Sequence, residues 1–454
     1  MIKRILTLTL ILFPALVINA LKFDVDTVSM KGTIDDCINI VFLPDGYQEE
    51  ELDKFSDDVD WMIDALFGKE PYPEYRDYFN CFAIQVPSEE SGAANDPDSL
   101  INNYFGSCFN NSGIWRLVVP RRSSKVQSVL QDNFPQYDQV VVVVNDSRYG
   151  GSGGWMATST THSNGPEICI HEIGHSFAGL SDEYWAGAGY ARENINMTQE
   201  TDPSVVRWKD WMGFRSVGIY SHSEDPSWKR PHQNCEMRYL NRNFCPVCQE
   251  AIASRILDLV NPIRSFSPQD EEFTLVDPWI DFSVELLKPN PNTLSLRWML
   301  NSDSIAGNVD SIRIQSENFL PSSNRLAVFI LDTTDYIRKS SHSRMHQSIV
   351  IWDFTNSSSG IHPQITKEKI NLEIYPNPAT EYIRVSFDLE QDQTFGIELI
   401  GQAGKQVRLI APEIRIAGHY DEKINLIGMG LSSGLYHLKV MTNGNMVTLP
   451  LIIN

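Results

Sequence analysis

Basic residues and long apolar runs are both scarce in this sequence. Its 454 residues include 37 Lys and Arg against 58 Asp and Glu, which gives a formal net charge of −21. Such an acidic chain repels nucleic-acid phosphates and anionic lipid surfaces, so neither is an expected partner. Beyond the N-terminus, no apolar run approaches the roughly 18 residues of a membrane-spanning helix. We therefore expect no membrane span in the mature chain.

Cysteine is absent from the C-terminal part of the chain. All seven cysteines precede residue 250, and the odd number leaves at least one thiol without a disulfide partner. No fixed-period repeat occurs, which argues against a solenoid. The acidic surplus leaves room for a structural Ca²⁺, although a solvated acidic surface is the favoured explanation.

The first twenty residues have the pattern of a signal peptide. Lys3 and Arg4 precede an apolar stretch from Ile5 to Val17, and the small pair Asn19-Ala20 ends it. The stretch is too short for a comfortable membrane span, although a retained N-terminal anchor is the alternative. We predict that residues 1–20 are removed and that the protein is extracellular or on the cell surface, with the periplasm as an alternative. Export also permits disulfides.

Two regions with different sequence patterns follow the predicted signal peptide. Residues 21–265 mix helix-like stretches, such as Glu49–Phe67, with strands such as Gln139–Val144. From about residue 266, short alternating runs separated by turn residues predict β-sandwiches. The predicted fold is α+β followed by all-β domains. Its expected divisions are a first domain over 21–265, an accessory β-sandwich over 266–369 and a C-terminal β-sandwich over 370–454.

The run His171-Glu172-Ile173-Gly174-His175 lies within a predicted helix, Ile168–Leu180. Residues four apart share a helix face, so the two imidazoles can bind one ion, and nitrogen ligands suit Zn²⁺. Glu172 is then placed to take a proton from zinc-bound water and to deliver it to a leaving amine. This pattern predicts one catalytic zinc ion, with Glu172 as general base. A core helix with two satisfied histidines is the alternative.

A catalytic zinc needs a third protein ligand and one open position. Gly179 can turn the chain out of the helix, and Asp182 follows it. We predict Asp182 as the third ligand. Glu183 and the more distant Glu193 remain rivals.

Three further features lie near this helix in the predicted domain. Met237 is a candidate for an apolar turn beneath the metal, a feature of metzincin peptidases, and Tyr239 could donate a hydrogen bond to an oxyanion. The Gly-rich run Tyr149–Gly154 could form a rim that accepts an extended peptide, or it could be a plain turn. The pair Cys245 and Cys248 could be half a zinc site, a redox pair or part of a disulfide. We favour a disulfide from Cys235 to one of them, and another between Cys81 and Cys108.

Several separated segments resemble the IgA-peptidase family of zinc metallopeptidases. They are HEIGHSFAGLSDEY (171–184), PDGY (44–47), VPSEESG (86–92), VNDSRYGG (144–151) and FCPVC (244–248). The resemblance spans about residues 30–260 and implies a metzincin-like catalytic domain. It also implies zinc on His171, His175 and Asp182, Glu172 as base and Met237 in the floor turn. The gaps from His175 to Gly179 and Asp182 are four and seven residues, instead of the usual three and six, so the helix must end differently.

The C-terminal region resembles a type IX secretion sorting domain. The segments that carry this resemblance are IYPNPA (374–379), YIRV (382–385) and LSSGLY (431–436). It implies an outer-membrane secretion machinery as a partner. An ordinary accessory β-sandwich is the alternative.

Together these features predict a secreted zinc-dependent endopeptidase that hydrolyses peptide bonds in extracellular proteins. Two other function classes remain. One is a different zinc hydrolase, such as an amidase acting on cell-wall peptides. The other is a protein-binding module on a degenerate peptidase scaffold, for which Glu172 would have no use.

Overall fold

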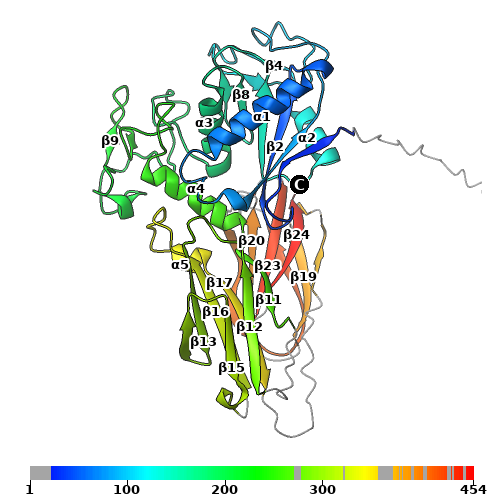
Figure 1. Ribbon diagram of the computed structural model, residues 1–454, viewed down its shortest axis with the longest axis vertical. Helices are drawn as coiled ribbons and strands as arrows, with labels where there is room; N and C mark the ends of the chain where they lie inside the picture. The colour runs from blue at the N-terminus through cyan, green and yellow to red at the C-terminus, as the bar shows by residue number, and fades with distance from the viewer. Residues whose placement is uncertain are drawn as a thin grey trace, which may run out of the picture. The chain divides into compact units, whose positions relative to one another are not determined.

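The computed structural model describes residues 22–269, 278–320, 323–355 and 372–453, the last range with gaps at 378, 381, 390–392, 402–405, 427–430, 432–433 and 443–445. The predicted signal peptide over residues 1–20 lies outside the described residues. The chain divides into two units, Met1–Asn356 and Ser357–Asn454. We describe each unit by itself (Figure 1).

A six-stranded sheet organises the first unit. Its four inner strands run parallel, and a short antiparallel strand lies at each edge. The strand order is β1 (Val25–Ser29), β3 (Phe79–Ile84), β2 (Ile38–Asp45), β6 (Gln139–Val144), β8 (Ala157–Thr160) and β7 (Gly151–Ser152).

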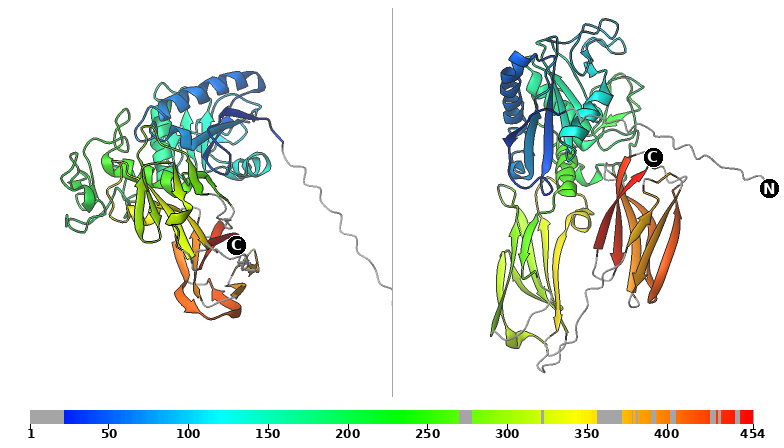
Figure 2. Two further views of the ribbon diagram at one scale, coloured as in Figure 1. Left: turned by 60° about the horizontal axis from the view of Figure 1, so that its bottom comes forward. Right: turned by 90° about the vertical axis from the view of Figure 1, so that its right-hand side faces the viewer.

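Helices cover both faces of this sheet. The first face packs against α1 (Leu52–Leu66), α3 (Gly165–Ala178) and α4 (Pro246–Leu259), and the second against α2 (Ser123–Asn133) (Figures 1 and 2). Side chains alternate along each strand, so Ile40 and Phe42 join the first core while Val41 joins the second. Burial on both sides explains the continuous apolar run of β6.

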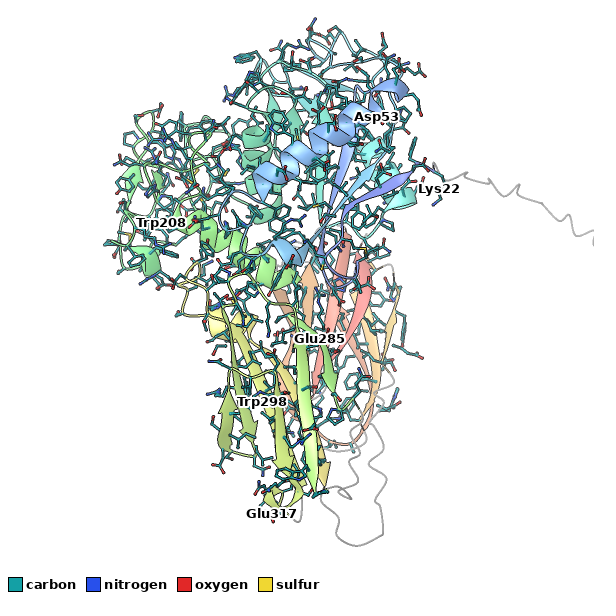
Figure 3. All side chains as sticks on the ribbon, viewed as in Figure 1. Lys22, Asp53, Trp208, Glu285, Trp298 and Glu317 are labelled. Carbon is teal, nitrogen blue, oxygen red and sulfur yellow. The ribbon has the colours of Figure 1, made fainter. Side chains whose placement is uncertain are left out.

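The chain between α3 and α4 contains little regular structure. It holds only the paired strands β9 (Tyr220–Ser221) and β10 (Lys229–Arg230) and one short 3₁₀ turn, Lys209–Trp211. Trp208 and Trp211 are nevertheless fully buried, and Figure 3 labels Trp208 beside α4. This segment therefore packs as a folded part of the domain. A second short pair, β4 (Ser107–Cys108) with β5 (Val119–Pro120), lies earlier in the chain.

A β-sandwich completes the first unit (Figure 2, green to yellow). Trp298 and Trp352 stack at its centre with ring centroids 5.7 Å apart, and Figure 3 labels Trp298. One sheet contains β11 (Ile263–Ser267), β12 (Trp279–Leu286) and β15 (Ser311–Gln315). The other contains β14 (Asp303–Gly307), β13 (Leu294–Leu300), β16 (Ser323–Asp332) and β17 (Ser348–Thr355), and α5 (His342–His346) precedes β17.

Buried tyrosines connect the sandwich to the helix-containing part. The hydroxyl of Tyr75 donates to Asp332 at 3.0 Å, and that of Tyr78 donates to the carbonyl of Leu287 at 3.1 Å. Buried hydrogen bonds of this kind are costly to break, because the freed groups lose their partners without reaching water.

The second unit consists of two antiparallel sheets around one apolar core. Its strands are β18 (Glu373–Tyr375), β19 (Tyr382–Leu389) and β22 (Gly418–Asn425) in one sheet, and β21 (Gln406–Arg415), β20 (Gln393–Gly401), β23 (Gly434–Thr442) and β24 (Met446–Ile453) in the other.

The predicted class, α+β followed by β-rich parts, is confirmed at this level. The predicted domain boundaries near residues 265 and 369 stay predictions. Among the helices of the described residues, none has both the length and the apolar character needed to cross a bilayer.

Candidate metal centre

Helix α3 carries the two histidines and ends where the chain must turn back towards them. Gly179 caps the helix in the left-handed region, at φ 65°, and its N–H donates to the carbonyl of His175 at 3.1 Å. The next turn is held by Asn196, which accepts from the N–H of Ser181 and donates to its carbonyl. These bonds bring Asp182 back beneath the helix.

Three side chains converge at this point. The Oδ1 atom of Asp182 lies 3.0 Å from Nε2 of His171 and 3.3 Å from Nε2 of His175. In a tetrahedral zinc site, ligands at about 2.0–2.1 Å from the ion lie roughly 3.3 Å from one another. Both distances from the Asp182 oxygen are close to this spacing.

The other ring nitrogens bind main-chain carbonyls. Nδ1 of His171 lies 3.1 Å from the carbonyl of Glu236, and Nδ1 of His175 lies 2.7 Å from the carbonyl of Leu180. Because a carbonyl only accepts, each Nδ1 must carry a proton, which leaves the lone pair of a neutral ring on Nε2. Two lone pairs that face a carboxylate oxygen form a donor set suited to a cation.

The charges of the site lead to the same conclusion. Burial lowers the pKa of His171, but the contact with Asp182 and the charge of Glu172 outweigh it and raise that pKa to about 10. Burial opposes ionisation of Asp182 as well, yet the two imidazoles hold the pKa of its carboxyl below the usual range. The protein thus concentrates negative charge where the histidines point, and this arrangement favours a bound cation.

The rival ligands point elsewhere. One carboxylate oxygen of Glu183 lies 3.1 Å from the sulfur of Cys248, in a buried cluster behind the site. The carboxylate of Glu193 accepts from Thr198 and from the N–H of Gln199, both at 2.7 Å. Of the three candidates for the third ligand, Asp182 is therefore the one that contacts both histidines.

Met237 lies directly against α3. A Cβ atom added to Gly174 would be 2.7 Å from the sulfur of Met237, so only glycine at position 174 lets Met237 lie this close to the helix. The N–H of Glu183 donates to the carbonyl of Met237 at 2.7 Å, which joins the turn to the segment carrying Asp182. Met237 is fully buried, and it contacts α3 at Gly174, which lies between the two histidines in the chain. Its role as an apolar floor for the site stays a prediction.

The Gly-rich segment packs on the other side of the helix. A Cβ on Gly153 would lie 2.7 Å from Cβ of His175 and 2.8 Å from Oε2 of Glu172. Gly151 lies in the edge strand β7. It forms an isolated bridge to Leu117 on the side of β7 that does not pair with β8. The glycines thus let the main chain touch the side chains of the site, and burial raises the pKa of Glu172 beneath them.

Arg116 and Tyr184 also line the site, although no sequence pattern indicated a role for either. The ring of Tyr184 stacks beside His171 at 6.3 Å and 24°, and the Arg116 guanidinium lies 5.9 Å from the Tyr184 ring centre. Both line a cavity of about 580 Å³ together with the two histidines and Glu172. Arg116 lies far from α3 in the chain, so no local pattern could have indicated it.

Tyr239 lies in an adjoining cavity of about 310 Å³, which His171 and Glu172 also line. Its side chain is 49% exposed, and the Arg238 guanidinium lies 4.6 Å from its ring centre. It therefore stands near the site, and a contact with substrate remains a prediction.

The disulfide predictions are wrong. All seven cysteines are buried and free. The sulfurs of Cys235 and Cys248 are 3.8 Å apart, far more than the roughly 2.05 Å of a disulfide, because both face Glu183 and Cys245 in one cluster. Cys81 belongs to the core under α1, whereas the sulfur of Cys108 contacts Asn111 instead.

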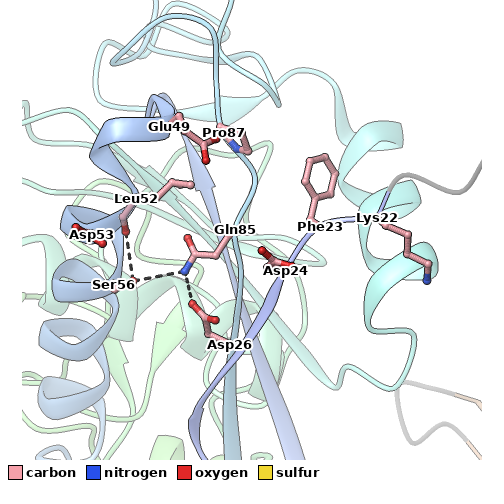
Figure 4. Close-up of a pocket in the computed structure, with 10 residues that line it drawn as sticks. All are labelled: Lys22, Phe23, Asp24, Asp26, Glu49, Leu52, Asp53, Ser56, Gln85 and Pro87. Carbon is pink, nitrogen blue, oxygen red and sulfur yellow. Dashed lines mark hydrogen bonds between the residues drawn. The ribbon is translucent and has the colours of Figure 1, made fainter.

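A separate pocket of about 460 Å³ lies between β1 and the start of α1 (Figure 4). Its lining includes Asp24, Asp26 and Gln85, and the amide of Gln85 donates to Asp26 at 2.5 Å. No histidine or cysteine lines it, so it offers no metal ligand of these two types.

Comparison with known proteins confirms both resemblances. Residues 28–217 match the family model of IgA Peptidase M64, and residues 373–454 match that of the secretion system C-terminal sorting domain. The first match indicates a peptidase, and the second indicates export to the cell surface or the extracellular space. No curated protein matches the chain.

Solved structures give only weak likenesses. The chain is similar over 42% of its length to dimeric latent PorU from Porphyromonas gingivalis, with 14% identity and a TM-score of 0.17, and it covers 20% of that protein. It is similar over 39% of its length to SGBP-B from Bacteroides ovatus, a protein solved with a mixed-linkage heptasaccharide, with 7% identity and a TM-score of 0.14. It covers 41% of that protein.

Proposed function

Because residues 28–217 match the IgA peptidase M64 family, we propose that the chain is an exported zinc-dependent endopeptidase. The observation that carries this proposal is the convergence of His171, His175 and Asp182, with both Nδ1 atoms held by main-chain carbonyls. His171, His175 and Asp182 would hold the ion. A bound Zn²⁺ acts as a Lewis acid that polarises the scissile carbonyl and lowers the pKa of water to about 7.

Glu172 supplies the proton transfers. Its side chain lines the cavity together with His171 and His175. Burial raises its pKa, which brings the carboxylate closer to the basicity that proton transfer near neutral pH requires. Glu172 takes the proton of the attacking water and later passes it to the departing amine.

Arg116 and Tyr184 are placed to stabilise negative charge that develops on the substrate oxygen. Both carry hydrogen-bond donors, and both line the cavity that contains Glu172. Donors fixed in advance at such a point typically contribute about 10²–10³-fold to the rate. Tyr239 reaches the adjoining cavity and is the other candidate for this role.

The substrate is an extended segment of a protein. The cavity is bordered by main chain at Gly151 and Gly153, where peptide backbone can approach closely. The exposed Trp155 follows this run and offers an apolar surface to a substrate side chain. We expect these features to favour unfolded or loop segments, and they do not select one protein substrate.

The test is hydrolysis of casein by the purified chain and two variants. Glu172→Gln should retain stoichiometric zinc and lose about 10²–10⁴-fold of the activity, because only proton transfer is removed. Glu193→Gln is the matched control and should keep both zinc and activity, since its carboxylate binds Thr198 and Gln199. Undiminished activity in Glu172→Gln, or zinc-loaded wild type that cuts no protein, would refute the proposal.

A further inference from the structure

A second group of metal-ligand side chains lies behind the segment that carries Asp182. It consists of Glu183, Cys235, Cys245 and Cys248, whose ligand atoms all lie within 4.8 Å of one another. No member is more than 2% exposed. We propose that these four residues bind a structural Zn²⁺ that is distinct from the ion proposed at the histidines.

The spacing of the four atoms fits a tetrahedral ion. With Zn–S bonds of about 2.3 Å, two sulfur ligands lie about 3.8 Å apart, and sulfur and oxygen ligands lie about 3.5 Å apart. The sulfurs of Cys235 and Cys248 are 3.8 Å apart. Oε1 of Glu183 is 3.1 Å from the sulfur of Cys248 and 3.6 Å from that of Cys245.

The carboxylate of Glu183 gives an independent reason for an ion. It is fully buried, and its Oε2 atom has no hydrogen-bond partner among the described residues. A buried carboxylate is costly unless it is paired or coordinates a metal. An ion at the centre of the cluster would balance this charge.

Hydrogen bonds to the sulfurs support thiolate ligands. The N–H of Cys245 donates to the sulfur of Cys235 at 3.2 Å. The side-chain amide of Asn196 lies 3.6 Å from the sulfur of Cys248 and 3.3 Å from Oε1 of Glu183. Such outer contacts orient metal ligands and stabilise their charge.

The position of the cluster indicates what the ion does. Glu183 follows Asp182, and Cys235 lies two residues before Met237. Cys245 directly precedes α4, and Cys248 lies in its first turn. All four coordination positions come from the protein, which is the arrangement of a structural site. The ion therefore joins the Asp182 segment, the Met237 turn and α4 into one rigid support. This structural role is independent of whether the chain is a peptidase.

The test measures the zinc content and zinc environment of the full chain. Wild type should contain two zinc ions. The double variant His171→Ala/His175→Ala should retain one, and zinc-edge X-ray absorption should then show sulfur at about 2.3 Å. A retained zinc without sulfur neighbours, or no zinc after both histidines are removed, would overturn the proposal. Wild type with a single sulfur-bound zinc would leave it standing and would instead count against the histidine site.

Thiol chemistry provides a second measurement that needs no variant. In the native chain, Cys235, Cys245 and Cys248 should become reactive towards an alkylating reagent once a chelator removes the ion. A disulfide among these three cysteines in protein isolated from the medium of the producing cells would contradict a zinc site.

Two cysteine variants provide a matched comparison. Cys245→Ser should lower the zinc content by one ion and destabilise the chain. Cys108→Ser, which removes a buried cysteine outside the cluster, should keep both ions.

Discussion

The contact between Gly174 and Met237 gives a quantitative test of the metal centre. In Gly174→Ala, the new Cβ would lie 2.7 Å from the Met237 sulfur, about 1 Å closer than an ordinary contact. Met237 is fully buried, so relief requires movement of the helix or of the turn. Overpacking of this kind costs about 1–3 kcal/mol, while alanine in a helix gains about 1 kcal/mol over glycine. We expect a free energy of unfolding lower by up to about 2 kcal/mol.

A double-mutant cycle separates the two effects. In the Met237→Ala background the sulfur is gone, so Gly174→Ala should be neutral or stabilising by about 1 kcal/mol. The coupling energy from urea denaturation should therefore be about 1–3 kcal/mol. Activity of the single variant should fall by about 10²-fold, because a shift of 1 Å in His171 or His175 misplaces the reacting groups. If Gly174→Ala changes stability equally in both backgrounds, Met237 does not support the helix.

Three other outcomes follow from the structure. Removal of zinc with a chelator should lower the melting temperature as well as the activity, and readdition should restore both; at a free-ion concentration of 1,000 times Kd the stabilisation is about 4 kcal/mol. Asp182→Asn should reduce the zinc content after dialysis, because a neutral amide replaces the carboxylate that faces both Nε2 atoms. Burial, together with the charge of Asp332, raises the pKa of Glu74 from 4.5 to about 7, so the folded chain binds this proton more tightly than the unfolded chain does. Stability should therefore fall as the pH rises from about 4.5 to 7, and Glu74→Gln should reduce that fall.

Each of these outcomes has a direct check. Thermal melts with and without chelator should coincide if the chain binds no stabilising metal. Full zinc occupancy in Asp182→Asn would show that another residue supplies the third ligand. For Glu74, urea titrations of wild type and Glu74→Gln between pH 4.5 and 8 should converge at low pH, and parallel curves would contradict the raised pKa.

Local patterns predicted several elements of the first unit, including the helix that carries His171 and His175. The apolar stripe of α1, the β-branched run of β6 and the histidine helix α3 are all found close to their predicted limits. The short helix α2 was not predicted, because it buries only three apolar residues, Val126, Val129 and Leu130. A stripe of that length is too brief for periodicity to reveal.

Features that depend on distant contacts could not be predicted in the same way. The carbonyl of Glu236 that binds His171 comes from a segment with little regular structure, and main-chain atoms leave no trace in composition. The environment of Cys245 and Cys248 includes Cys235 and Glu183, which lie close to them only in the folded chain. The number and spacing of the cysteines therefore favoured disulfides. In the fold, the sulfurs of Cys235, Cys245 and Cys248 lie around the buried carboxylate of Glu183.

The main-chain acceptors of the two histidines have a consequence for how the site tolerates change. Both acceptors are main-chain oxygens, so a side-chain replacement at position 180 or 236 that leaves the backbone in place keeps the imidazole tautomers. Substitutions in these segments can therefore change the surroundings of the site without changing the orientation of the His171 and His175 rings. Insertions or deletions that shift the backbone are the changes to which ring orientation is vulnerable.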